Sequence, residues 1–365
     1  MEKRQKGMMY SIIMAIVLLG LSAICWIKPA DEFSATERRQ LEQFPEISVE
    51  TILSGKFMED FEEYTQDQFP FRDTFRSIKS WMHKYVLGQA DNKDVYAIDG
   101  YISKLDYPLS EKALDRAVRK FDFIYQKYIE GTDAKVYSVW IPDKNVYLAK
   151  ENGYPAYDYD ILYEYMNQEL TYMTNIDIRE YLSIEDYYRT DTHWKQENIV
   201  DVAGKIANVM GISLRAEYES IETDAPFYGV YYGQYGLPVE PDSITYLENK
   251  LFADCIITNH DTGKQISMYD LTRLNGRDPY EMYLSGSVSV ITIENPNATS
   301  AKELVIFRDS YGSSLAPLLV EGYAKIILLD VRYLNQNVIG NFVTFDNQDV
   351  LFLYSTIVLN NETTF

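Results

Sequence analysis

Residues 303–330 read ELVIFRDSYGSSLAPLLVEGYAKIILLD. Within this stretch, Glu303–Phe307 and Ala324–Asp330 are short, apolar and bounded by polar residues, as buried strands are. The residues between them, Ser313 to Glu321, have a helical pattern. A strand, a helix and a second strand in so short a stretch indicate a βαβ unit, whose two strands are parallel. The sequence therefore predicts an α/β fold with a parallel sheet flanked by helices.

The rest of the chain supplies further elements of both kinds. Residues 135–141 are a candidate strand, because they are mostly apolar and β-branched and precede a polar turn. Apolar residues recur at helical spacing over 75–86, 114–128 and 199–210, and a glycine ends each of these segments. We expect residues 212–295, which are rich in Tyr and Gly, to be irregular with some hairpins.

The composition narrows the class of protein. The chain has 365 residues, enough for one large domain or two ordinary ones, and 46% of them are hydrophobic. Its 55 acidic and 34 basic residues give a formal net charge of −21. Such a surface repels phosphates, which argues against nucleic acid as a partner. The two cysteines, Cys25 and Cys255, are not expected to pair, so the fold must rely on its hydrophobic core.

The first residues predict a membrane anchor. Met8–Ile27 carries no charge and, at about 1.5 Å per residue, is long enough to span a bilayer core of about 30 Å. Lys28–Asp31 lacks the small-x-small pattern of a cleavage site, and Ile24 is too bulky for a lipidation motif at Cys25. Three basic residues precede the apolar run and predict a cytoplasmic N-terminus: Lys3, Arg4 and Lys6. We therefore expect a single-pass, uncleaved signal anchor in the cell membrane, with the C-terminal part extracytoplasmic.

These boundaries divide the chain into four parts. We expect a cytoplasmic tip at 1–7, the transmembrane anchor at 8–27, a juxtamembrane and helical segment at 28–95, and the extracytoplasmic domain at 96–365.

Ser310 lies at the corner between the strand predicted at 303–307 and the helix that follows. The carboxyl ends of parallel strands are where α/β sheets bind ligands. Backbone N–H groups of the new helix turn, which begins at Tyr311, can point at a developing oxyanion, and the helix dipole favours negative charge there. The alternative is that Asp309 and Ser310 only cap the helix, a common role for both residue types.

Asp191 and His193 form a second candidate pair. In an extended loop, residues two apart face the same way, so the carboxylate can orient the imidazole. His193 is the only one of the three histidines with a carboxylate two residues before it. Two alternatives stay open. The pair could ligate a metal, for which Asp-x-His alone is a weak signal, or Asp191 could be a cap and His193 a packed side chain.

Together, the two segments supply a complete set for nucleophilic catalysis. A serine nucleophile needs a base to take its proton, and the base needs a third group that fixes its tautomer and stabilises its charged form. Ser310, His193 and Asp191 can fill these three roles without a metal or a cofactor.

Three further residues are lesser candidates. Tyr311 opens the helix after Ser310 and could contact substrate or an oxyanion. Asn145 follows the strand at 135–141 and could donate another hydrogen bond to an oxyanion, although Asn is common in turns. Arg332 follows the last predicted strand and could reach the same cleft, or pair with one of the many acidic residues of the surface.

Three segments of the chain, taken in this order, resemble the DHHW protein family. They are Asp67–Asp73 (DQFPFRD), Thr190–Trp194 (TDTHW) and Arg308–Tyr311 (RDSY). This family is similar to the alginate O-acetylation proteins, which have a domain like that of SGNH hydrolases. The match extends from about Phe57 to Tyr354.

By position, the resemblance makes Ser310 the nucleophile, His193 the base and Asp191 its orienting partner. In ordinary SGNH hydrolases the serine precedes the Asp and His, whereas in the resembled group it follows them, as it does here. Thr192 stands where the family name implies a histidine, a departure outside the three roles.

The resemblance implies a membrane-anchored, SGNH-hydrolase-like O-acetyltransferase that acts on an extracellular or cell-wall polysaccharide. It also implies a polytopic membrane acyltransferase as the partner that supplies the acyl group. Two alternatives remain at this point: a carbohydrate acetylesterase with the same triad, and a non-catalytic factor that binds glycan or assists assembly.

Overall fold

The computed structural model describes residues 2–34 and 36–365. The chain folds into two compact units. The first comprises the residues up to Lys93 together with Tyr232–Pro238, and the second comprises Asp94–Tyr231 and Val239–Phe365. The candidate site therefore belongs to the second unit, and the predicted anchor belongs to the first.

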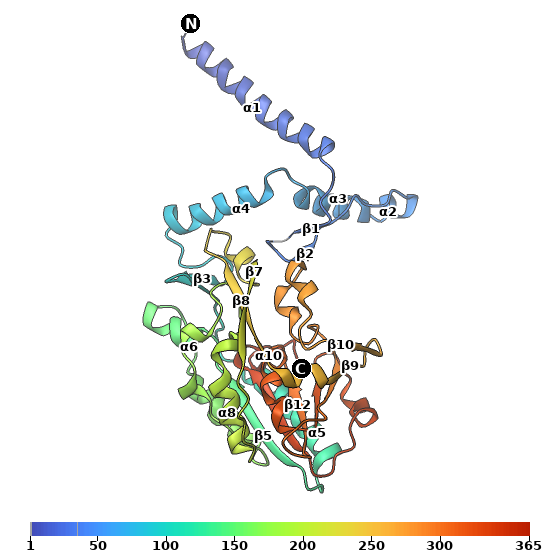
Figure 1. The fold of residues 1–365 in the computed structure, drawn as a ribbon. Coiled ribbons are helices and arrows are strands. Elements are labelled where there is room, and N and C mark those ends of the chain that lie inside the picture. The colour runs from blue at the N-terminus through green and yellow to red at the C-terminus, as the bar shows by residue number, and fades with distance from the viewer. Residues whose placement is uncertain (1, 35) are drawn as a thin grey trace. The chain divides into compact units, whose positions relative to one another are not determined.

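The second unit is built on an eight-stranded sheet (Figure 1). Five neighbouring strands are parallel, and three antiparallel strands extend one edge. The order across the sheet is β10 (Lys264–Ile266), β9 (Ile256–Asn259), β11 (Val290–Glu294), β13 (Lys325–Leu329), β12 (Glu303–Arg308), β14 (Asp349–Ser355), β5 (Lys135–Ile141) and β6 (Thr174–Asn175). The predicted α/β fold with a largely parallel sheet among helices is confirmed.

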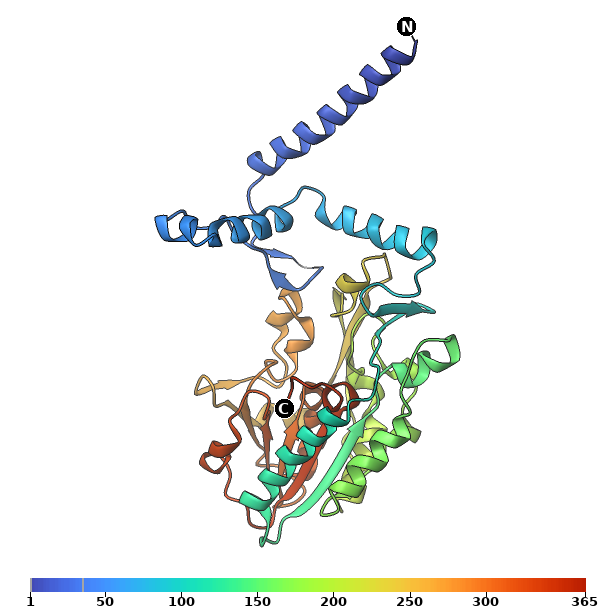
Figure 2. The ribbon, with the colours of Figure 1, turned by 180° about the vertical axis from the view of Figure 1, so that it is seen from behind.

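Helices cover both faces of this sheet. Alternate side chains of β12 point to opposite faces: Leu304 and Ile306 join one core cluster, and Val305 and Phe307 join the other. The first cluster includes α8 (Val200–Val209) and α10 (Tyr311–Leu319), and the second includes α5 (Glu111–Ile124) and α7 (Tyr159–Glu169). Figure 2, in which the molecule is viewed from behind, shows α5 lying across the sheet. Both faces are buried, which explains why the parallel strands are continuously apolar.

The βαβ unit lies where the sequence predicts it, as β12, α10 and β13. The two strands are parallel neighbours, with Val305 opposite Ile327. The helix begins at Tyr311, where the sequence places its first turn, and its nine residues are all buried. The helix is therefore a core element with no exposed face.

Residues 212–295 are more ordered than expected. A long hairpin is formed by β7 (Glu219–Phe227) and β8 (Asp242–Glu248), and β9–β11 of the same region join the main sheet. The other elements of this unit are β3 (Val95–Ile98), β4 (Tyr101–Lys104), α6 (Asn145–Leu148), α11 (Thr356–Leu359), the π-helical η2 (Tyr125–Ile129), and the 3₁₀ turns η3 (Lys150–Asn152), η4 (Arg179–Tyr181), η5 (Ile184–Asp186), η6 (Gln196–Asn198), η7 (Lys250–Asp254), η8 (Leu271–Asn275), η9 (Pro279–Met282), η10 (Val320–Gly322) and η11 (Gln336–Asn341).

The first unit begins with helix α1 (Glu2–Ile27). Within α1, Gln5–Cys25 is long and apolar enough to cross a membrane. The remaining elements are short: β1 (Phe33–Ser34), β2 (Arg39–Gln40), α2 (Val49–Leu53), α3 (Lys56–Asp67), α4 (Arg72–Trp81), the π-helical η1 (Met82–Val86) that continues α4, and α9 (Tyr232–Tyr235).

Candidate active site

Ser310 lies at the carboxyl end of β12, where the chain turns into α10. Asp309 holds this corner: its Oδ1 accepts the backbone N–H of Tyr311 at 3.0 Å, and its Oδ2 accepts that of Ser355 at 2.7 Å. Ser355 is the last residue of β14, so the corner is fixed to the neighbouring strand. The Ser310 side chain makes no capping bond to α10. The capping role therefore belongs to Asp309, and the hydroxyl of Ser310 is left for another partner.

That partner is His193. The Ser310 Oγ lies 2.7 Å from Nε2 of His193, although the two residues are 117 positions apart in the chain. The other ring nitrogen, Nδ1, lies 2.6 Å from Oδ1 of Asp191. His193 and Asp191 are buried, whereas Ser310 is half-buried. The structure thus brings together the three side chains that the sequence nominates, in the order Ser, His, Asp.

The hydrogen bonds define how each nitrogen of His193 is used. An ionised carboxylate only accepts hydrogen bonds, so Nδ1 must carry the proton that faces Asp191. Nε2 is then the acceptor and the Ser310 hydroxyl is the donor. This tautomer is the one in which an imidazole can take a proton from a serine.

Asp191 is itself held by backbone groups. Its Oδ1 also accepts the backbone N–H of His193 at 3.1 Å, and its Oδ2 accepts that of Val230 at 2.7 Å. Gly229 lies so close that a Cβ there would come within 2.3 Å of the Asp191 Cβ. The loop after β7 therefore fixes the carboxylate from the side opposite His193.

A second carboxylate supports the loop that carries the pair. Asp242, at the start of β8, accepts the backbone N–H groups of Arg189 and Thr190 at 2.8 Å each. It also accepts the Thr190 hydroxyl at 2.6 Å. These bonds satisfy the donors of a buried, irregular segment. Asp242 is therefore a positioning residue, and no local pattern in the sequence marks it.

Tyr280 is a further residue of the site that the sequence analysis does not predict. Its ring stacks on the His193 imidazole, with centroids 3.7 Å apart and planes inclined by 6°. An aromatic face at this distance holds the imidazole plane and attracts its protonated form. Tyr280 comes from η9, in the region expected to be irregular, and only the assembled fold places it beside His193.

Ser314 connects α10 to the loop that carries Asp191 and His193, called here the histidine loop. Its Oγ accepts the indole N–H of Trp194 at 2.9 Å and lies 2.8 Å from the Tyr280 hydroxyl. Its carbonyl oxygen accepts the side-chain amide of Gln196 at 2.8 Å. Because Ser310 directly precedes α10, the nucleophile and its base are carried on segments that are bonded to each other.

Tyr311 contributes to this framework. Its hydroxyl donates to the carbonyl oxygen of Thr192 at 2.5 Å, and its ring lies edge-on to Trp194. Its backbone N–H is already bonded to Asp309, and that of Gly312 reaches the Asp309 carbonyl at 3.2 Å. The structure therefore places Tyr311 as a support for the histidine loop, with its own N–H engaged.

Asn145 lies in a different hydrogen-bond network. Its Oδ1 accepts the hydroxyls of Tyr96 and Ser103, and its Nδ2 donates to the Lys104 carbonyl at 2.6 Å. These contacts attach the β3–β4 hairpin to α6, and we assign Asn145 no part in the reaction.

The neighbouring Lys144 supports the histidine loop through hydrogen bonds to its backbone. Its Nζ donates to the carbonyl oxygens of Tyr188 at 3.0 Å and Arg189 at 3.2 Å, and to that of Ile102. Burial lowers the pKa of Lys144 to about 7.

Arg332 is paired with a buried carboxylate. Its Nε and Nη2 donate to the two oxygens of Asp330 at 2.9 and 2.6 Å. Asp330 also lies 4.0 Å from Arg308, which is fully buried and donates to the Ser313 hydroxyl. Arg332 therefore pairs with an acidic residue, as in the alternative stated above, but this residue is buried and not on the surface.

Among residues 2–34 and 36–365, no group of three or more His, Cys, Asp or Glu side chains is arranged to hold a metal ion. His193 uses one ring nitrogen for Asp191 and the other for Ser310.

Comparison with known proteins gives relatives in structure only. The sequence matches no protein-family model and no curated protein. The fold is similar to that of a DHHW family protein from Eubacterium siraeum, with 21% identity and a TM-score of 0.60 over 74% of this chain and 92% of that one. It is also similar to Bacillus cereus PatB1, solved with a sulfonyl adduct, with 17% identity and a TM-score of 0.58 over 74% of this chain and 97% of that one. The resemblance to the DHHW family is therefore confirmed at the level of the fold.

Proposed function

We propose that this chain is a membrane-anchored serine O-acyltransferase that acetylates a hydroxyl of an extracellular or cell-wall polysaccharide. One observation carries the proposal: the continuous chain of hydrogen bonds from Ser310 through His193 to Asp191. A half-buried serine can act as a nucleophile when its hydroxyl donates to the unprotonated Nε2 of an imidazole, as here.

The first half-reaction forms an acyl-enzyme. His193 Nε2 takes the Ser310 proton while Oγ attacks the carbonyl carbon of the acyl donor. The imidazolium is stabilised by Asp191 and by the stacked ring of Tyr280. The tetrahedral intermediate then collapses, its bond to the leaving group breaks, and His193 returns the proton to that group.

The second half-reaction uses the same groups in reverse. A sugar hydroxyl gives its proton to His193 and attacks the Ser310 ester, and collapse of the intermediate releases Oγ, which takes the proton back. If water attacks instead, the product is free acetate and the enzyme is an esterase. Transfer requires that the acceptor sugar exclude water from the acyl-enzyme.

Two further facts support this assignment. PatB1, which shares the fold, was solved with a sulfonyl adduct, and sulfonyl reagents attach to nucleophilic side chains. Helix α1 contains a segment long enough to span a bilayer, which suits a substrate outside the cell. We propose α1 as an uncleaved anchor and a polytopic membrane acyltransferase as the donor of the acyl group.

A covalent probe tests the nucleophile. Phenylmethylsulfonyl fluoride should add one sulfonyl group to the wild-type chain and none to Ser310→Ala, as read by intact mass. Ser287→Ala, at an exposed serine, is the matched control and should label normally. Equal labelling of wild type and Ser310→Ala would remove Ser310 as the nucleophile.

A competition between acceptors tests transfer. The wild-type chain, an activated acetyl ester and a polysaccharide fragment should yield an acetylated sugar, detected as a fragment heavier by one acetyl group. Release of acetate alone, at a rate unaffected by sugar, would assign the chain as an esterase. Absence of both products together with absence of labelling would favour a binding protein.

A further inference from the structure

Helix α4 and its continuation η1 carry an apolar stripe on their exposed side. Phe71, Phe75, Ile78 and Met82 recur at intervals of four, three and four residues, so they follow one side of the helix. All four are exposed, as are Trp81, Tyr85, Val86 and Leu87. The only buried residue of α4 is a serine, Ser80.

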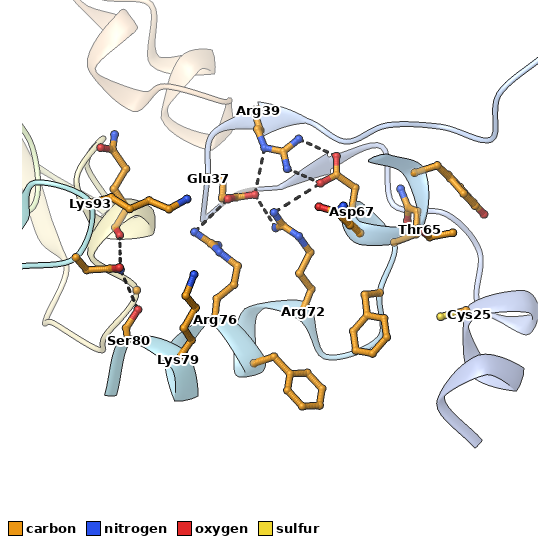
Figure 3. Close-up of a pocket in the computed structure, with 18 of the residues that line it drawn as sticks. Cys25, Glu37, Arg39, Thr65, Asp67, Arg72, Arg76, Lys79, Ser80 and Lys93 are labelled. Atoms are coloured by element: carbon orange, nitrogen blue, oxygen red, sulfur yellow. Dashed lines mark hydrogen bonds and ion pairs between the residues drawn. The ribbon is translucent and has the colours of Figure 1, made fainter. Parts of the chain in front are cut away.

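The side of α4 that faces the rest of its own unit carries two arginines, and Phe75 lies at its edge. Figure 3 shows Arg72 and Arg76 pointing toward Glu37, and all three residues line a cavity of about 980 Å³. Their nitrogens lie 2.6 and 3.1 Å from the two Glu37 oxygens. Burial alone would raise the pKa of Glu37, but the hydrogen bond from Arg72 and the neighbouring arginine charges outweigh it and lower this pKa. The Ser80 hydroxyl accepts Asn92 at 3.0 Å.

Helix α4 is therefore amphipathic, but its orientation is the reverse of that expected for a surface helix in water. A surface helix in water turns its apolar stripe to the core and its charges outward. Here Arg72 and Arg76 are turned inward and paired with Glu37, whereas the apolar stripe is left open. Exposed apolar stripes of this size mark a surface that contacts another apolar phase or partner.

The start of α4 is tied to the end of the predicted anchor. Gln68, just before α4, accepts the backbone N–H of Asp31 at 2.8 Å and donates to the Asp31 carbonyl at 2.8 Å. Asp31 lies four residues after Ile27, the last residue of α1, which is at most about 14 Å along the chain. If α1 spans the membrane, Gln68 must lie at the membrane surface.

We propose that α4 and η1 lie flat on the outer face of the membrane that α1 spans, at the boundary between lipid and water. The stripe of Phe71, Phe75, Ile78 and Met82 is inserted among the lipid acyl chains. This inference rests on the proposed role of α1 as an anchor. Trp81 and Tyr85 suit this depth, because aromatic residues with a polar edge favour the interface. The binding is apolar and needs no anionic lipid, since the chain carries a net charge of −21 and the α4 arginines are engaged by Glu37.

Quenching of tryptophan fluorescence by brominated lipid tests this contact. The full chain with Trp26→Phe is reconstituted in phosphatidylcholine vesicles. Trp140 and Trp194 are 2% and 0% exposed, so Trp81, at 51%, is the tryptophan open to lipid. Lipid brominated near the headgroup end of its acyl chains should quench the emission, and the further change Trp81→Phe should remove this quenching.

A matched pair of charge variants separates the stripe from the rest of the chain. Ile78→Glu, in the stripe, should abolish most of the quenching of Trp81. Ser287→Glu places the same charge on an exposed serine of the second unit, outside α4, and should leave the quenching unchanged. Vesicle flotation is measured in parallel. Vesicles that carry the chain without quenching of Trp81 would overturn the interfacial contact and leave the stripe to a protein partner. A chain that does not float with vesicles would overturn the anchor itself.

Discussion

The Asp191 carboxylate uses both oxygens, and an amide cannot replace it. Asp191→Asn keeps one acceptor oxygen, so either His193 Nδ1 or the Val230 N–H must face an NH₂ group. We expect turnover of a chromogenic acetyl ester to fall by about 10³- to 10⁴-fold, because the imidazole loses its tautomer and its counter-charge. Near-wild-type turnover with an unchanged melting temperature would show that Asp191 only supports the loop.

Tyr280 offers a test of ring stacking on the base. Tyr280→Phe keeps the stacked ring and loses only the bond to Ser314, so turnover should stay within a few-fold of wild type. Tyr280→Ala removes the aromatic face that stabilises the imidazolium and should lower turnover roughly tenfold. The kcat of the two variants, compared at equal folded fraction, measures the effect. Equal losses in both would assign the role to the hydroxyl.

Glu197 should make the fold less stable as pH rises. Burial raises the pKa of Glu197 to about 7 from its ordinary 4.5, and its Oε2 has no hydrogen-bond partner among the described residues. The folded protein therefore binds more protons than the unfolded chain between these two values, and stability falls as pH rises through them.

Glu197→Gln should remove this penalty. The free energy of unfolding should rise by up to about 3 kcal/mol at pH 8 and change little near pH 4, where the carboxyl is neutral in both states. Thermal melts of both chains across this range give the comparison. A gain that is largest at low pH would contradict the assignment.

Single residues of the site differ in how far the sequence reveals them. Ser310 and the Asp191–His193 pair are visible because each sits in a local pattern whose chemistry has a known use. Tyr280, Val230 and Asp242 are invisible because their roles arise only when the loop after β7, the start of β8 and η9 are packed around His193. Local spacing carries no information on such contacts.

Among the elements, the loop after β7 controls the site through Gly229. In Gly229→Ala, the new Cβ would lie 2.3 Å from the Asp191 Cβ and 2.4 Å from its backbone, so one of the two segments must move. We expect kcat to fall at least tenfold, with a smaller change in KM, because the carboxylate shifts from Nδ1 of His193. Gly204→Ala, in α8 with open space around it, is the control and should leave kcat unchanged.

The elements that were correctly predicted from the sequence are those whose apolar residues follow a single clear pattern. Strand β5 has the predicted bounds, and α8 differs by one residue at each end. Strand β14 was not predicted, because its continuous apolar run is equally compatible with a buried helix segment. The strands β9 to β11 lie in a region whose short alternating runs suggest only local hairpins. Local patterns could not show that β11 pairs with β13 and so joins β9 and β10 to the main sheet.

At the scale of the whole molecule, the anchor has a simple test. The chain purified from membranes should keep its N-terminus through Met8–Ile27, because Lys28–Asp31 offers no cleavage site. Intact mass distinguishes the anchored chain from one that begins near Ala30. Protease added to spheroplasts should digest the second unit while the first residues stay protected. A mature chain that begins near Ala30 would make α1 a signal sequence.

The position of β14 also determines when the sheet can be completed during synthesis. It is inserted between β12 and β5, yet it follows both in the chain. As the polypeptide leaves the ribosome, β5 and β12 emerge with one edge each unpaired, and such edges invite aggregation. Pairing between strands so distant in sequence is slow. A nascent chain that stops before Asp349 therefore holds two half-sheets with no strand to join them, and the excess of acidic residues opposes association between such chains until those seven residues arrive.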